Sequence, residues 1–136
     1  MYFLLSALSF RSSQLSGIRR VAIFPAPHGI DTASVEQLLD AYLEKIGTNG
    51  AVKLHPGFVA YPALTERIRE IVTRRGLLPE CICGKDAIVE MEMTHEYKEL
   101  FGARSFLLVY AEIFGSDYCL LKLPGYTANP LILESL

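Results

Sequence analysis

Two short motifs carry the residues that could do chemistry. His55 and Pro56 directly follow the apolar run 51–54, and Arg104 and Ser105 open a second apolar segment. A histidine oriented by a proline turn can bind or protonate a phosphate, because imidazole titrates near neutral pH. A serine at a helix N-terminus adds a hydroxyl and unpaired backbone amides, and an arginine adds a fixed cation. Together the motifs predict a phosphate-binding site.

The elements that must position these motifs alternate along the chain. From residue 20 onward, apolar runs of strand length alternate with segments of helical period, a pattern typical of a parallel sheet covered by helices. We expect strands at 21–24, 51–54, 87–91 and 118–123, helices at 32–46, 62–75 and 105–114, and a loop over 77–86. The fold class is α/β: a small Rossmann-like three-layer domain with a mainly parallel sheet of about four strands. Ligands of such domains bind beyond the carboxyl ends of the strands, where both motifs lie.

The length and net charge of the chain limit how many domains it can form and which partners it can bind. The chain has 136 residues and 51% hydrophobic content, which is enough for one core. We expect an apolar lead-in over 1–19, a nucleotide-binding domain over 20–123 and a tail over 124–136. With 13 Lys and Arg against 15 Asp and Glu, the net charge is -2, so we expect no nucleic-acid partner.

Membrane and metal signatures are absent from the sequence. The apolar run 1–10 is shorter than the roughly 20 residues that cross a bilayer. No basic residue precedes it, as a signal peptide would require, so a cytoplasmic location without a transmembrane segment is expected. Cys81 and Cys83 are too close together for the usual zinc spacing, and the three histidines show no zinc pattern either. We therefore expect no metal and no cofactor.

The segment 52–56, Val-Lys-Leu-His-Pro, resembles the His-Pro motif of bacterial sialyltransferases, including the polysialyltransferase family of capsule polysaccharide synthesis. Residues 102–108 occupy the place of the Ser-Ser or Ser-Thr motif that opens a helix in those enzymes, and residues 110–116 are similar too. Arg104 stands where the first serine of that motif is expected. The resemblance covers residues 20–123 and corresponds to the C-terminal, nucleotide-sugar-binding half of a two-domain glycosyltransferase of the GT-B type.

The resemblance implies a CMP-sialic-acid donor and no metal or cofactor. In such enzymes the His-Pro histidine assists departure of the leaving group, so His55 inherits the catalytic role. An acidic residue near the ribose corresponds to Glu96. The implied nucleotide- and phosphate-binding residues are His55, Pro56, Gly102, Arg104, Ser105 and Glu96.

The acceptor side of the reaction is not part of this resemblance. In the similar transferases the glycan acceptor and the catalytic base belong mainly to an N-terminal domain, and we expect residues 20–123 to correspond only to the other half. Donor binding is therefore expected of the chain alone, and transfer only with a second domain. Peripheral association with the inner face of the membrane also agrees with capsule synthesis.

Three alternatives stay open at this point. The CDP-glycerol and CDP-ribitol polymerases of teichoic-acid synthesis resemble the chain at the same two motifs. A non-catalytic α/β binding module would use the His-Pro turn and Ser105 only for structure. An interaction fragment would cover a partner with the apolar segments 1–10 and 131–136. The glycine-rich phosphate loops and the Gly-x-Ser-x-Gly nucleophile motif do not occur, which argues against typical dinucleotide, ATP and α/β-hydrolase sites.

Overall fold

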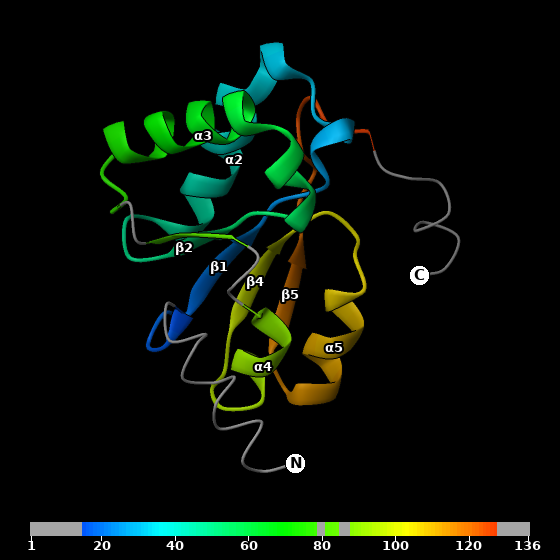
Figure 1. Ribbon diagram of the computed structural model, residues 1–136. Helices are drawn as coiled ribbons and strands as arrows, with labels where there is room; N and C mark the ends of the chain where they lie inside the picture. The colour runs from blue at the N-terminus through cyan, green and yellow to red at the C-terminus, as the bar shows by residue number, and fades with distance from the viewer. Residues whose placement is uncertain (1–14, 79–80, 85–87, 128–136) are drawn as a thin grey trace.

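The computed structural model describes residues 15–78, 81–84 and 88–127, and within them the chain forms one parallel sheet (Figure 1). The sheet has five strands in the order β3–β2–β1–β4–β5. They are β1 (Arg20–Ile23), β2 (Ala51–Lys53), β3 (Ile82–Cys83), β4 (Glu99–Gly102) and β5 (Asp117–Leu120). The expected α/β, Rossmann-like fold is therefore confirmed.

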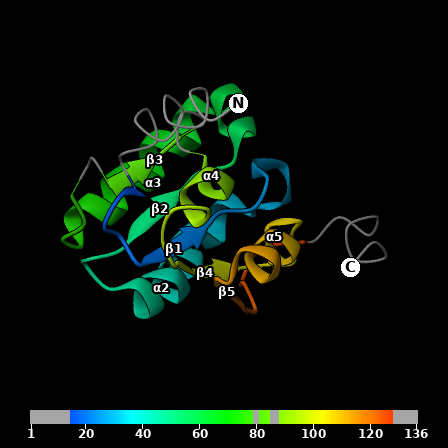
Figure 2. The same cartoon turned by 90° about the horizontal axis from the view of Figure 1, so that it is seen from below.

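Helices cover both faces of this sheet. On one face lie α2 (Val35–Ile46) and α3 (Pro62–Arg74), and on the other lie α4 (Val89–Met93) and α5 (Leu107–Phe114), as Figures 1 and 2 show. Alternate residues of each strand supply the two cores. In β1, Ala22 packs with α2 and α3, whereas Val21 and Ile23 pack with α4 and α5. Three layers result, as the alternation of the sequence predicts.

The first helix follows its sequence signals closely. The Asp31 carboxylate accepts a hydrogen bond from the Ala33 amide, 3.1 Å away, at a short 3-10 turn that leads into α2. Gly47 ends the helix with φ of 64°, a conformation that suits glycine. The buried stripe consists of Val35, Leu38, Leu39, Tyr42 and Ile46, as the helical spacing predicts.

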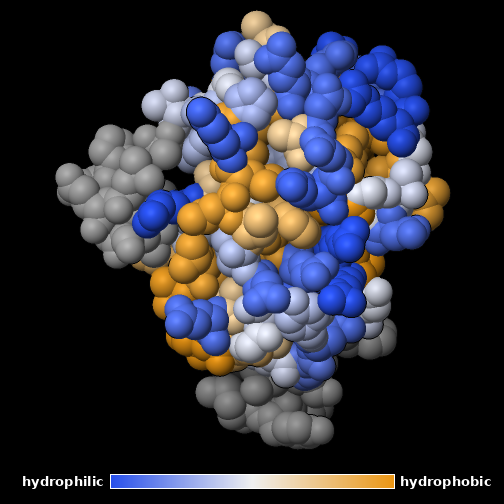
Figure 3. All heavy atoms as spheres, turned by 180° about the vertical axis from the view of Figure 1, so that it is seen from behind, coloured by the Kyte–Doolittle hydropathy of each residue, from blue (hydrophilic) through white to orange (hydrophobic). Residues whose placement is uncertain are grey.

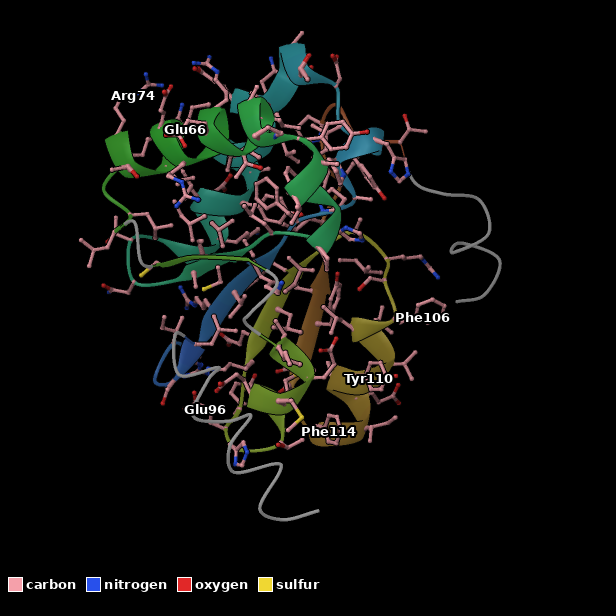
Figure 4. All side chains as sticks on the ribbon, in the orientation of Figure 1. Glu66, Arg74, Glu96, Phe106, Tyr110 and Phe114 are labelled. Carbon is pink, nitrogen blue, oxygen red and sulfur yellow. The ribbon has the colours of Figure 1, made fainter. Side chains whose placement is uncertain are left out.

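Charges on the outer sides of α2 and α3 pair with one another. Glu36 accepts hydrogen bonds from Arg67 and Arg74, at 3.1 Å and 3.4 Å, and Arg75 pairs with Asp40. Arg74 and Glu66 project outward from α3 in Figure 4. Exposed ion pairs contribute between about 0 and 1 kcal/mol each, so this charged face needs no functional explanation.

Two expectations for the second half of the chain are wrong. Residues 89–93 form the helix α4 rather than a strand, because Val89 and Met93, one helical turn apart, are both buried against the sheet. The third strand is instead Ile82–Cys83, inside the segment expected to be a loop. The strand Glu99–Gly102 was not anticipated, and it raises the number of strands from about four to five.

The remaining boundaries shift by a few residues. The last helix begins at Leu107 rather than at 105, and the last strand is Asp117–Leu120 rather than 118–123. Residues 1–14 of the expected lead-in and 128–136 of the expected tail lie outside the described residues. Within the part of the chain that the structure describes, every helix is too short or too polar to cross a membrane.

The order of the strands reverses direction at β1. The chain moves outward from β1 through β2 to β3, then returns and places β4 on the other side of β1. Gly102 lies beside Ile23 in this central pair, and a Cβ atom at Gly102 would lie only 2.8 Å from the Ile23 carbonyl oxygen. The close approach of the two strands therefore requires glycine here. Crevices at such reversals are the usual ligand sites of open α/β sheets.

Candidate functional site

A cavity of about 880 Å³ opens at the carboxyl ends of the strands, beside the reversal of strand order. Its volume falls within the range of roughly 300–1,000 Å³ of small-molecule sites. The chain segments after β1, β2 and β4 contribute most of its lining, together with the start of α4. The lining residues fall in segments 23–26, 28–29, 53–56, 88–90, 103–107, 118 and 126–127.

The cavity brings the two sequence motifs together. His55 and Pro56 line it from the end of β2, and Arg104 and Ser105 line it from the end of β4. Gly102 does not line the cavity, but it allows β4 to pack closely enough against β1 for this arrangement. The residues are separated by about fifty positions in sequence and meet only because β2 and β4 flank β1.

His55 begins a 3-10 turn over Pro56–Ala60, and its Nδ1 accepts a hydrogen bond from the amide of Gly57 at 2.9 Å. Burial lowers the pKa of His55 below its ordinary value, and the charges of Lys53 and His28 lower it further. The ring is therefore neutral at pH 7, and because Nδ1 accepts, Nε2 carries the proton. His55 is thus a neutral hydrogen-bond donor at the edge of the cavity.

Lys53, at the end of β2, is a second cation in the lining. Its ammonium group donates hydrogen bonds to the carbonyls of Leu54, at 2.9 Å, and Gly84, at 2.7 Å. These bonds tie the segment after β3 to the end of β2. Lys53 therefore fixes the backbone that carries His55 and also adds positive charge near it.

Ser105 caps the helix on the other side of the cavity. Its Oγ accepts a hydrogen bond from the Leu107 amide at 3.1 Å, and the hydroxyl of Tyr118 lies 3.5 Å away. Tyr118 donates to the carbonyl of Ala103, and burial raises its pKa to about 12. Tyr118 thus stays protonated and holds the loop between β4 and α5 in place.

The charge balance of the lining favours an anion. Arg104 is exposed and forms no ion pair with any residue that the structure describes. Lys53 and Arg104 face a single carboxylate, that of Glu90, within the described lining. His28 and His55 add nitrogen donors or acceptors. A phosphate group would meet an excess of cationic and N–H groups here.

Glu96 does not belong to this site. It lies before β4, at the amino end of the sheet, where it accepts hydrogen bonds from the Gly17 amide, at 2.9 Å, and from Lys98, at 2.6 Å. Figure 4 shows Glu96 near the end of the molecule opposite the cavity, well away from Phe106. The expected ribose contact is therefore corrected: the acidic side chain that lines the cavity is Glu90.

Sequence reasoning missed three residues of the site. Tyr118, Tyr126 and Glu90 all line the cavity, although none of them was expected to belong to it. Tyr118 had a usable signal, because it lies in an expected strand of the same parallel sheet. An isolated antiparallel β-bridge to Ile30 brings Tyr126 to the cavity, and no local sequence pattern predicts this bridge. Among the described residues, no cluster of three or more His, Cys, Asp and Glu could hold a metal ion.

Comparisons of the chain with protein-family models, with curated proteins and with solved structures find no match.

Proposed function

We propose that the cavity binds the nucleotide-phosphate end of a CMP-linked sugar, and that the chain is the donor-binding part of a CMP-sialic-acid-dependent glycosyltransferase. The observation that carries the proposal is the meeting of His55 with Arg104 and Ser105 around one cavity at the reversal of strand order. The choice of cytidine and of sialic acid rests on the resemblance of the two motifs to bacterial sialyltransferases.

In the proposed transfer reaction, the site must stabilise the phosphate that leaves the sugar. When the bond between sugar and phosphate breaks, negative charge grows on the phosphate oxygens, and donors aimed at that charge lower the barrier. His55 offers the Nε2–H group without first taking up a proton, since its pKa is lowered by burial and by Lys53. Arg104 adds a charge-assisted partner in place of the hydroxyl that the sialyltransferase motif has there. Acceptor binding and the catalytic base are assigned to a second domain.

The direct test is calorimetric titration of the purified chain with CMP, CDP and UMP. We expect CMP to bind, and His55→Ala to weaken its affinity at least tenfold, because a donor to a charged oxygen is lost. The matched control is His95→Ala, since His95 does not line the cavity. Equal CMP binding by the wild type and His55→Ala would end the proposal.

A second variant examines the other half of the site. Ser105→Ala should reduce CMP affinity by about 1–3 kcal/mol if the hydroxyl is a buried phosphate partner. Because Ser105 also caps α5, the melting temperature of this variant must be measured alongside. A preference for CDP over CMP would favour the CDP-glycerol or CDP-ribitol class, and absence of nucleotide binding would favour a non-catalytic module.

A further inference from the structure

Helix α5 exposes an unusual number of apolar side chains. Phe106, just before the helix, is 57% exposed and Ile113 is 66% exposed, and Val109, Tyr110 and Phe114 are each at least 40% exposed. Figure 4 shows Phe106, Tyr110 and Phe114 along the length of α5, with Phe106 at the end of the helix that borders the cavity. We refer to these five residues as the α5 face. A helix at the surface normally has its polar side toward water, so this face needs a partner.

The aromatic residues of the α5 face form an evenly spaced row with a phenylalanine at each end. Phe106, Tyr110 and Phe114 are spaced by four residues, so they lie above one another on one side. The rings of Tyr110 and Phe114 stack with centroids 6.4 Å apart and an angle of 10° between their planes. Reversing the direction of the row exchanges Phe106 with Phe114 and leaves Tyr110 in place. In a two-fold contact each residue of a patch lies opposite a residue of the same patch, and this row would then place aromatic rings opposite aromatic rings.

We infer that the α5 face binds a second copy of this chain. In the antiparallel arrangement, Tyr110 packs on Tyr110 of the partner subunit, and Phe106 packs on Phe114 of the partner subunit. The exposed parts of the α5 face and of Leu120 amount to on the order of 500 Å² per copy, taking about 150–250 Å² for a whole large side chain. Two copies together reach the roughly 1,000 Å² expected of a specific interface.

The edge of the sheet supports the same partner. Strand β5 ends the sheet, pairs with β4 alone within the described chain, and has Leu120 46% exposed. Figure 3 shows apolar surface gathered on the left of that view, where β5 and α5 lie. An unpaired edge beside an apolar helix is a surface that a second copy can cover without any change in fold.

The charges of α5 favour a protein over a lipid surface. Residues 107–114 contain one charged side chain, Glu112, and no Lys or Arg. Helices that lie on membranes usually carry Lys and Arg on their polar side, where they meet anionic headgroups. Glu112 is two residues from Tyr110, about 200° around the helix, so it lies away from the aromatic row and leaves the contact uncharged.

Sedimentation velocity of the full chain over a range of concentrations tests the inference. We expect a dimer that Tyr110→Glu converts to a monomer, because two buried carboxylates would meet at the two-fold axis. The control is Val59→Glu, which places the same charge at a side chain that is 72% exposed and distant in sequence from α5. It should remain a dimer. A wild-type monomer at every concentration, or a dimer that survives Tyr110→Glu, would overturn the inference.

Cross-linking keeps the test decisive if Tyr110→Glu misfolds. In a Cys119→Ser background, which removes the exposed native thiol, Tyr110→Cys should form an intermolecular disulfide while Glu112→Cys does not. Equal cross-linking at both positions would contradict an antiparallel contact centred on Tyr110. Co-sedimentation of a monomeric chain with phosphatidylcholine and phosphatidylserine vesicles would assign the α5 face to a membrane and also overturn the proposal.

Discussion

The two ends of the sheet differ in how fully the protein itself engages their charged side chains. At the carboxyl ends, the charged groups Lys53, Arg104 and Glu90 surround a cavity of about 880 Å³. At the amino ends, Lys98 is fully buried, and its ammonium group donates to the carbonyls of Leu15 and Ile18 and to the Glu96 carboxylate.

The difference separates structural charges from those available to a ligand. The amino-end cluster uses all three N–H donors of Lys98 within the protein, and it ties the segment before β1 to β4. Burial raises the pKa of Glu96, but hydrogen bonds from Lys98 and from the Gly17 amide outweigh it, so the pKa is lowered overall. The cavity end retains an exposed arginine and a neutral histidine. Burial and hydrogen-bond partners, more than residue type, therefore distinguish the charges that the protein itself engages from those that stay accessible.

The largest expected effect is at the amino end. Lys98→Ala should lower the free energy of unfolding by about 3 kcal/mol, because two carbonyls lose their side-chain donor and the Glu96 carboxylate loses its cation, keeping only the Gly17 amide. Urea unfolding measures the change. Lys122→Ala, at an exposed lysine, is the control and should stay within about 0.5 kcal/mol of the wild type. A loss below 1 kcal/mol at Lys98 would remove the distinction between the two ends.

Gly102→Ala should destabilise the centre of the sheet. The added Cβ would lie 2.8 Å from both the Ile23 carbonyl oxygen and the Tyr118 hydroxyl, so β1 and β4 must separate. We expect a loss of about 1–3 kcal/mol in urea unfolding. Gly84→Ala is the matched control, because nothing lies within 4 Å of a Cβ atom there. Equal stabilities of the two variants would show that the close approach is unimportant.

Arg104→Ala sharpens the comparison from the cavity side. Since Arg104 is exposed and has no ion-pair partner among the described residues, its loss should leave urea unfolding unchanged. CMP affinity should fall about tenfold, because a charge-assisted phosphate contact disappears. Arg69→Ala removes a partly exposed arginine on α3 and should change neither quantity. A loss of stability with unchanged affinity would place Arg104 among the structural charges.

The smallest effect concerns the pH dependence of stability. The lowered pKa of His55 means that the unfolded chain binds a proton more readily than the folded chain. The contribution of His55 to stability is therefore present above about pH 6.5 and decreases as the pH falls toward its folded-state pKa. His55→Asn keeps an acceptor for Gly57 but does not titrate, so its urea unfolding should lose this dependence. An NMR titration in which the pKa of His55 in the folded chain lies above 6.5 would contradict the prediction.

The first half of the fold was predictable because its patterns are long. The stripe of α2 contains five buried positions and ends at Gly47, and α3 begins at Pro62. Periods of this length identify a helix, and the apolar runs between them identify β1 and β2.

The second half was less predictable because its elements are short. β3 has two residues and α4 has five, so each covers little more than one period of its pattern. Glu90 and Glu92 alternate with apolar residues, which is typical of a strand. Residues 89–93 instead form the helix α4, which packs against α5. The two motifs were expected to share one crevice because both follow strands, and His55 and Ser105 do line the same cavity, whereas their role in binding stays a prediction. The prediction for Glu96 was wrong because β4 was not recognised in the sequence, so the end of the sheet at which Glu96 lies could not be known.

The position of β4 has a consequence for how the chain folds. β1 and β2 are joined by two short 3-10 turns and one α-helix, so this unit can form early from local contacts, whereas β4 pairs with β1 across 79 residues of chain. Contacts between such distant segments form slowly, because a long loop must close, with a loss of chain entropy, before the contacts can stabilise the fold. We expect β4 to join the sheet late in folding, bringing the Ser105 side of the cavity with it. A newly made chain would then complete the cavity in the last step, and CMP affinity, if the proposed site is right, would report completed folding.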